Sequence, residues 1–137
     1  MLTATDIALP ALGGARVLVV ETGRDAAAAL TGLLRLNGFD AHAVHTGAAA
    51  LAAAADARPR VVVIDLDLPD ADPCQVIRRL RAAADPPVVV VLTGHTDSAH
   101  RRAAADAGAA EYLLKPSEPA DLVRLLTRHC SPDPVAR

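Results

Sequence analysis

Four polar residues each follow directly on a short apolar run of the sequence. They are Glu21 after RVLVV, Asp65 after VVVI, Thr93 after VVVVL and Lys115 after AEYLL. If these runs are strands of a parallel sheet, their carboxyl ends meet at one edge, which is where such folds carry their sites. Each residue alone has an ordinary explanation, as a cap, a loop acid, a strand-end hydroxyl or a surface lysine. Two carboxylates, a hydroxyl and an ammonium at the same level instead predict a site that does chemistry.

Three more aspartates follow Asp65 in the stretch DLDLPDAD. Asp67 lies past the strand end, where strand alternation no longer sets the direction of its side chain. Asp70 follows a proline and is typical of a turn. Asp72 precedes a proline, which predicts a helix N-cap followed by proline at the first helical position. Of the four aspartates, only Asp65 is expected to do chemistry through its side chain.

Short apolar runs alternate with helix-forming stretches along the chain. The expected strands are Arg16–Val20, Asp40–Val44, Val61–Ile64, Val88–Leu92 and Ala110–Leu114. The expected helices are Asp25–Asn37, Gly47–Ala55, Pro73–Ala83, Ser98–Ala107 and Glu118–His129. Two runs, VVVI and VVVVL, are continuous and mostly β-branched, as in strands that helices cover on both faces. The five strand–helix pairs predict an α/β fold with a five-stranded parallel sheet, right-handed crossovers and helices on both faces.

The composition is that of one soluble globular domain. The 137 residues carry a formal net charge of −2, and the only aromatic residues are Phe39 and Tyr112, so binding to nucleic acid is not expected. Cys74 and Cys130 have no metal or redox spacing, which favours reduced thiols in a cytoplasmic protein. The sequence shows neither a signal peptide nor a membrane-spanning run. We expect a flexible extension over residues 1–14, one domain over 15–130 and a flexible tail over 131–137.

The five histidines show no convincing set of metal ligands. His42 and His45 are three residues apart, and His95 and His100 are five apart. These spacings do not by themselves indicate a metal site. We expect none of the four to bind a metal.

The pieces VLVVET, VVVIDLDLPDAD, VVVVLTGH and AGAAEYLLKP, in that order, resemble the receiver domain of bacterial two-component response regulators. The resemblance extends from Arg16 to His129 and rests on a DxxLP segment, a strand-end threonine and a Lys-Pro pair. It implies the flavodoxin-like strand order 2-1-3-4-5. It also implies a signalling module, not an enzyme beyond slow self-dephosphorylation. Such a module takes a phosphoryl group from a histidine kinase or a phosphotransfer protein and then binds a downstream protein partner.

The resemblance further implies a role for each strand-end residue. Asp65 is the expected phosphoacceptor, with Lys115 as a point charge on one phosphoryl oxygen and the Thr93 hydroxyl donating to another. Thr93 and Tyr112 are the expected switch residues, because the family couples the strand-end threonine to an aromatic ring. The peptide between Lys115 and Pro116 is expected to be cis.

The expected metal site departs from the family pattern. The resemblance implies Mg²⁺ held by the carboxylates of Glu21 and Asp65 and by the backbone carbonyl of Asp67. Most receivers carry two adjacent acids after the first strand, and the second, a direct metal ligand, corresponds to Thr22. This change removes a negative charge, makes Thr22 a weak candidate as a ligand and predicts weaker Mg²⁺ binding and slower phosphorylation. Arg24 is an alternative built-in cation.

Other functions remain open at this stage. If Thr22 abolishes useful metal binding, the chain is a pseudo-receiver that binds proteins without being phosphorylated. A haloacid-dehalogenase-like phosphatase is a remote alternative, because Asp65-Leu66-Asp67 matches its DxD motif, but that family usually opens with the DxD strand. The chain has no room for a DNA-binding output domain, which leaves a stand-alone receiver or a piece of a longer protein.

Overall fold

The computed structural model describes residues 14–130, which form a five-stranded parallel sheet with five helices. The strands are β1 (Arg16–Val20), β2 (Asp40–Val44), β3 (Val61–Ile64), β4 (Val88–Thr93) and β5 (Glu111–Leu114). The helices are α2 (Arg24–Leu36), α3 (Gly47–Ala57), α4 (Pro73–Arg81), α5 (Ser98–Ala107) and α6 (Pro119–Cys130). The strand order is β2-β1-β3-β4-β5, which confirms the order that the resemblance implied. The flexible segments expected at residues 1–13 and 131–137 lie outside the described residues.

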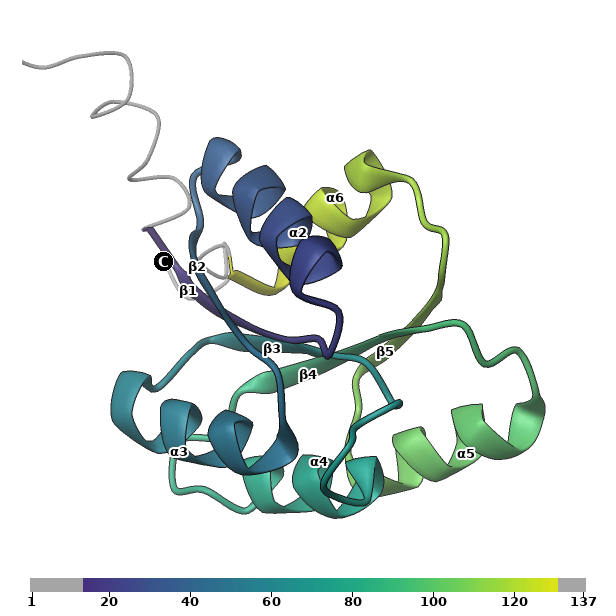
Figure 1. Cartoon of the computed structure of the whole chain (residues 1–137). Helices are drawn as coiled ribbons and strands as arrows, with labels where there is room; N and C mark the ends of the chain where they lie inside the picture. Colours follow the sequence, from purple (N-terminus) through teal and green to yellow (C-terminus); the bar gives the residue numbers. More distant parts are fainter. Residues whose placement is uncertain (1–13, 131–137) are drawn as a thin grey trace, which may run out of the picture.

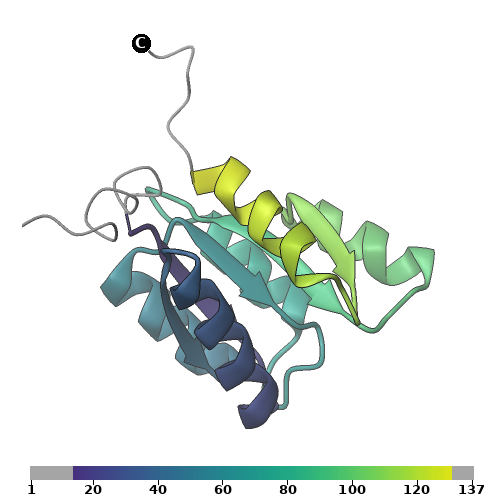
Figure 2. The same ribbon diagram turned by 90° about the horizontal axis from the view of Figure 1, so that it is seen from above.

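Helices cover both faces of the sheet. The helices α2 and α6 lie on one face, and α3, α4 and α5 lie on the other (Figure 1). Seen from above, α2 and α6 cross over the strands beneath them (Figure 2). Because side chains alternate along a strand, each central strand contributes to both layers of core. In β3, Val61 and Val63 pack in the α2–α6 layer, whereas Val62 and Ile64 pack in the α3–α5 layer.

The β-branched runs explain why the central strands are buried. All four residues of β3 are buried, as are five of the six in β4, which is the burial expected of inner strands covered on both faces. The edge strand β5 is less buried along its whole length. The expected elements are therefore confirmed, and their bounds shift by at most two residues, as is usual where helix ends fray.

Polar residues mark the starts of three helices. Thr46, Asp72 and Asp97 each accept a hydrogen bond from a backbone N–H in the first turn of α3, α4 and α5, respectively. The N-cap predicted at Asp72 is thus confirmed, with Pro73 at the first helical position. At its other end, α5 stops at Gly108, whose φ of 118° lies in the left-handed region that favours glycine.

Two further sequence expectations concern the cysteines and membrane spans. Cys74 and Cys130 are both free thiols, the second of them buried. Between residues 14 and 130, every helix is too short or too polar to span a bilayer.

Candidate functional site

Glu21 and Asp65 lie side by side at the carboxyl edge of the sheet. They directly follow the neighbouring strands β1 and β3, whose register pairs Val20 with Ile64. The Asp65 N–H continues the ladder by donating to the Val20 carbonyl at 3.0 Å. Both acidic residues are only 9 % exposed. Buried carboxylates are costly unless charge or hydrogen bonds compensate them, so this pair requires a cation.

Lys115 supplies that cation from the carboxyl end of the edge strand β5. Its backbone N–H donates to the Thr93 carbonyl at 2.8 Å, which extends the pairing of β4 and β5 beyond the strand ends. Its Nζ donates to Glu21 Oε1 at 2.5 Å and to Asp65 Oδ2 at 2.9 Å. Burial lowers the pKa of Lys115, but the hydrogen bonds to the two carboxylates more than offset this and raise the pKa above its ordinary value of 10.5. The lysine is therefore protonated and bridges both acids at neutral pH.

The loops after β1 and β3 are joined by Thr22. Its hydroxyl donates to the Asp67 carbonyl at 3.0 Å. The remaining carboxylate oxygens of the site accept backbone hydrogen bonds, Glu21 Oε2 from Gly23 and Asp65 Oδ1 from Asp67. The Asp67 carbonyl, which the resemblance implied as a metal ligand, thus already accepts a hydrogen bond. The donor is Thr22, the residue that stands where most receivers have a second acid.

The two expected switch residues both hydrogen-bond to the backbone of His95. Thr93 is fully buried, and its hydroxyl oxygen accepts a long hydrogen bond of 3.4 Å from the His95 N–H. The Tyr112 hydroxyl donates to the His95 carbonyl at 2.8 Å, and the Arg101 guanidinium lies 4.5 Å from the centre of the Tyr112 ring. Burial raises the pKa of Tyr112 above its ordinary value of 10, so the phenol stays protonated as a donor.

Two residues at this edge have contacts that the sequence pattern did not predict. His95 bridges the switch residues through its backbone and also bonds the Asp67 carboxylate through Nε2 at 2.7 Å. Asp70, expected only as a turn residue, accepts hydrogen bonds from the N–H groups of Gly47 and Ala48 and so caps α3 from a distant loop.

Arg24, the alternative cation considered from the sequence, is exposed at the start of α2. The two buried acids are instead paired with Lys115. The Lys115-Pro116 peptide is cis, as the resemblance implied.

The donor atoms at this edge fit a hard divalent cation in type. Two carboxylates and a carbonyl are the oxygen ligands that Mg²⁺ takes in proteins. The side chains of Glu21 and Asp65 are only 12 % and 10 % exposed, and Lys115 already offsets part of their charge. The arrangement can therefore hold a cation between the carboxylates or bind a small anionic group beside Lys115. It offers a cation one negative charge fewer than a site with two adjacent acids after β1, because Thr22 is uncharged.

Comparisons with known proteins agree with this geometry. The model of the response regulator receiver domain family matches residues 17–127. The transcriptional regulatory protein PrrA of Mycobacterium tuberculosis is 40% identical over 108 residues, which are 79% of this chain and 46% of PrrA. The DNA-binding response regulator MtrA of Mycolicibacterium paratuberculosis is 39% identical over 108 residues, covering 79% and 48% of the two chains. The chain thus spans about half the length of these curated relatives.

A solved structure with a lower sequence identity has the same fold. It is the receiver domain of the sensor histidine kinase PA1611 from Pseudomonas aeruginosa, determined with a magnesium ion coordinated in the active-site cleft. It is 28% identical, aligns with a TM-score of 0.78 and covers 85% of this chain and 98% of its own.

Proposed function

Because the chain belongs to the response regulator receiver domain family, we propose that it is a phosphorylation switch with Asp65 as the phosphoacceptor. Receiver domains are signalling modules that interact with histidine kinases, and this chain is expected to take its phosphoryl group from one or from a phosphotransfer protein. The observation that carries the proposal is the bridge from Lys115 Nζ to the Glu21 and Asp65 carboxylates. It places a carboxylate nucleophile beside a fixed positive charge at a strand end.

The reaction requires little more of the protein than position and charge. An oxygen of Asp65 attacks the phosphorus of a phosphohistidine, the P–N bond breaks with its electron pair left on the imidazole nitrogen, and an acyl phosphate forms. Lys115 then pairs with an oxygen of the bound phosphoryl group. Glu21 keeps the lysine at the site, because its second carboxylate oxygen is held by the Gly23 N–H.

Mg²⁺ is the proposed cofactor, held by Asp65, Glu21 and the Asp67 carbonyl. When bound, it neutralises negative charge on the phosphoryl oxygens. Thr22 makes this site weaker in two ways. It supplies no negative charge, and its hydroxyl occupies one lone pair of the Asp67 carbonyl. The Asp67 carbonyl therefore has only one lone pair left for a metal ion.

The switch itself is proposed to run through His95. If the Thr93 hydroxyl turns toward a phosphoryl oxygen, it leaves the His95 N–H without its partner. The His95 carbonyl in turn holds the Tyr112 hydroxyl. A change at Thr93 can thus reach Tyr112 and the surface of β5 and α5, where a downstream protein partner is expected to bind.

The test is phosphorylation by acetyl phosphate, followed by intact mass with and without Mg²⁺. We expect one phosphoryl group on the wild type, which requires metal and is absent from Asp65→Asn. Thr22→Asp restores the missing charge and removes the hydroxyl from the Asp67 carbonyl. It should lower the Mg²⁺ concentration needed for half-maximal labelling by about tenfold, the equivalent of about 1.4 kcal/mol. Labelling of Asp65→Asn at the wild-type level would refute Asp65 as the acceptor.

A pseudo-receiver is the second candidate, and the hydrogen bond from Thr22 to the Asp67 carbonyl favours it. In that case the wild type takes no phosphoryl group at any Mg²⁺ concentration, and the present arrangement of Tyr112 is its only working state. Gain of labelling in Thr22→Asp alone would then show that a single residue keeps the site silent.

A further inference from the structure

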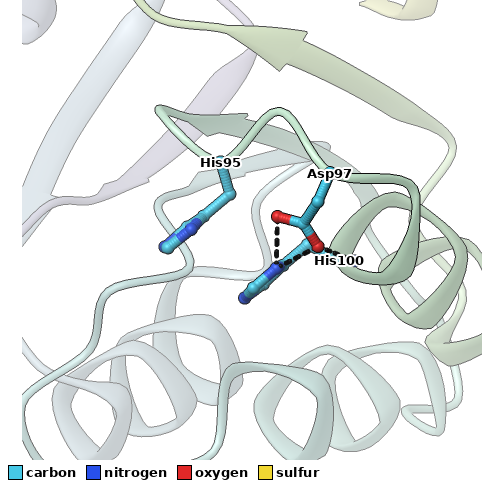
Figure 3. A group of neighbouring side chains, drawn as sticks. All are labelled: His95, Asp97 and His100. Atoms are coloured by element: carbon cyan, nitrogen blue, oxygen red, sulfur yellow. Dashed lines mark hydrogen bonds and ion pairs between the residues drawn. The ribbon is translucent and has the colours of Figure 1, made fainter.

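Three side chains at the start of α5 bring metal-ligand atoms together outside the phosphorylation site. Among residues 14–130, His95, Asp97 and His100 are the one group of three His, Cys, Asp or Glu residues whose ligand atoms all lie within 4.8 Å of one another. The two imidazole rings stack with centroids 4.1 Å apart and an angle of 9° between their planes. Figure 3 shows the two rings side by side, with the Asp97 carboxylate over His100.

Two of the proposed ligands, His100 and Asp97, already hold their ligand atoms close together. Both oxygens of Asp97 lie close to His100 Nδ1, at 2.8 and 2.7 Å. Around a tetrahedral Zn²⁺ with bonds of about 2.1 Å, neighbouring ligand atoms are about 3.4 Å apart. A metal ion in place of the proton between His100 and Asp97 therefore needs only a small opening of this contact.

The hydrogen bond of His95 to Asp67 leaves the other ring nitrogen, Nδ1, available to bind a metal ion. Nε2 of His95 bonds Asp67 Oδ1 at 2.7 Å, and a carboxylate on the second ring nitrogen is the usual outer partner of a metal-bound histidine. With the proton on Nε2, the lone pair of the ring lies on Nδ1. The side chain of Asp67 thus orients the His95 ring as a metal ligand. The backbone carbonyl of Asp67 is a separate group and accepts the hydrogen bond from Thr22.

Charge and exposure allow an ion to enter and stay. The start of α5 is the positive end of a helix dipole, which opposes a cation, but Asp97 and Asp67 supply two negative charges within the cluster. The side chains of His95, His100 and Asp97 are 34 %, 46 % and 50 % exposed, so the rings can turn to face one ion and water can complete its coordination.

We propose that His95, Asp97 and His100 form a binding site for a divalent transition-metal ion such as Zn²⁺, with Asp67 as the outer partner of His95. Two imidazoles and a carboxylate suit zinc, cobalt, nickel or copper, whereas Mg²⁺ prefers oxygen ligands alone. The site is thus distinct in ligand type from the carboxylate site around Asp65. Because the His95 backbone bonds both Thr93 and Tyr112, an ion here also fixes the segment that joins the two.

The experiment is a titration of the tag-free chain with Co²⁺, whose visible absorption bands report nitrogen ligands and a low coordination number. With excess Mg²⁺ present to occupy the carboxylate site around Asp65, we expect one Co²⁺ ion to bind per chain and to be displaced by Zn²⁺. His95→Gln and His100→Gln should each weaken Co²⁺ binding by about tenfold or more. Asp97→Asn should also weaken it, although asparagine keeps the cap on α5.

Two matched variants serve as controls. His42→Gln removes a histidine that also bonds an aspartate, Asp40, at 2.8 Å but that stands outside the cluster, and it should leave Co²⁺ binding unchanged. His129→Gln, which removes a histidine that bonds Glu111 at 3.0 Å and also stands outside the cluster, should likewise leave Co²⁺ binding unchanged. The absence of Co²⁺ binding to the wild type, equal binding by His100→Gln, or a loss of binding in His42→Gln as large as that in His100→Gln would each overturn the proposal.

Discussion

Within the segment from Asp65 to Asp72, the carboxylate of Asp65 is held in a different way from those of Asp70 and Asp72. Asp65 is buried at the end of β3, and its charge is offset by the ammonium of Lys115. Asp70 and Asp72 are exposed, and their carboxylates accept backbone N–H groups at the starts of α3 and α4. A buried carboxylate interacts strongly with a full charge because little water screens it, whereas an exposed one gains only a modest amount from a hydrogen-bonded helix start.

The two arrangements also differ in how many charges they balance. At the buried site a single lysine serves both Glu21 and Asp65, so that one negative charge remains uncompensated within the site. At the helix starts each carboxylate faces N–H dipoles and open water. Substitutions at the buried site should therefore have large effects of either sign, and those in the loop should have small ones.

Removal of the buried cation should have the largest effect. Lys115→Met keeps most of the side-chain volume but leaves Glu21 and Asp65 as adjacent buried charges. Loss of one partner from a fully buried pair costs about 3–5 kcal/mol, and because Lys115 is 35 % exposed we expect about 2 kcal/mol of unfolding free energy to be lost at pH 7. Urea denaturation measures this loss.

Lys115→Arg is the matched control, because it keeps a cation at the site. The raised pKa of Lys115 means that its contribution is complete at all pH values below 10.5 and is lost only as the pH rises through the higher folded value. The difference between wild type and Lys115→Met should therefore stay constant from pH 7 to pH 9. A decline over that range would contradict the bridge.

The loop is fixed to α3 by a close approach at Gly47, whose N–H bonds Asp70 at 2.7 Å. A Cβ at Gly47 would lie 2.8 Å from Ala71 Cβ and 3.1 Å from Val76 Cγ2, so Gly47→Ala should lower stability by about 1–2 kcal/mol. Gly32, inside α2, has open space around the same position. Gly32→Ala should raise stability by about 0.5–1 kcal/mol, because alanine favours helix. Thermal unfolding of the two variants should move in opposite directions.

Removal of one buried acid should act in the opposite sense to removal of the lysine. Asp65→Asn leaves Glu21 and Lys115 as a balanced pair, and its amide oxygen can still accept the Asp67 N–H. Relief of the repulsion between two carboxylates should raise the free energy of unfolding by about 1 kcal/mol at pH 7 and low salt. If urea denaturation instead shows a loss, the site does not carry an excess of negative charge.

The sequence predicted the fold well because burial on two faces leaves a strong pattern. The runs VVVI and VVVVL have no polar residue to place at a surface, so they fit only inner strands of a covered sheet. The edge strand β5 is less regular, and there the expected start at Ala110 lies one residue before the observed Glu111. The strand order followed from the resemblance and not from any residue pattern.

The sequence predicted those site residues whose positions are set by the ends of the strands. Glu21, Asp65 and Lys115 meet because each directly follows a strand of known direction. Thr22 and His95 lie one to two residues farther on, where the path of the loop, and not the strand period, sets the direction of a side chain. Their hydrogen bonds to Asp67 join positions 45 and 28 residues apart, which no local spacing reveals.

The smallest effects are expected for the loop aspartates Asp70 and Asp72, and the effect at Asp70 depends on pH. Hydrogen bonds from the N–H groups of Gly47 and Ala48 lower the pKa of this carboxyl below 3.8. The contribution of this carboxylate to stability is therefore present above pH 3.8 and is lost as the pH falls through its lowered pKa in the folded protein.

Asp70→Asn keeps one oxygen acceptor but not the charge, so this variant should be slightly less stable than the wild type at pH 7. Asp72→Asn should change less, because asparagine caps a helix about as well as aspartate. Urea denaturation at pH 7 and at pH 3 measures both variants, and the deficit of Asp70→Asn should narrow at the lower pH. A deficit that is the same at both values would mean that the α3 cap works by geometry alone and that charge matters only at the buried site.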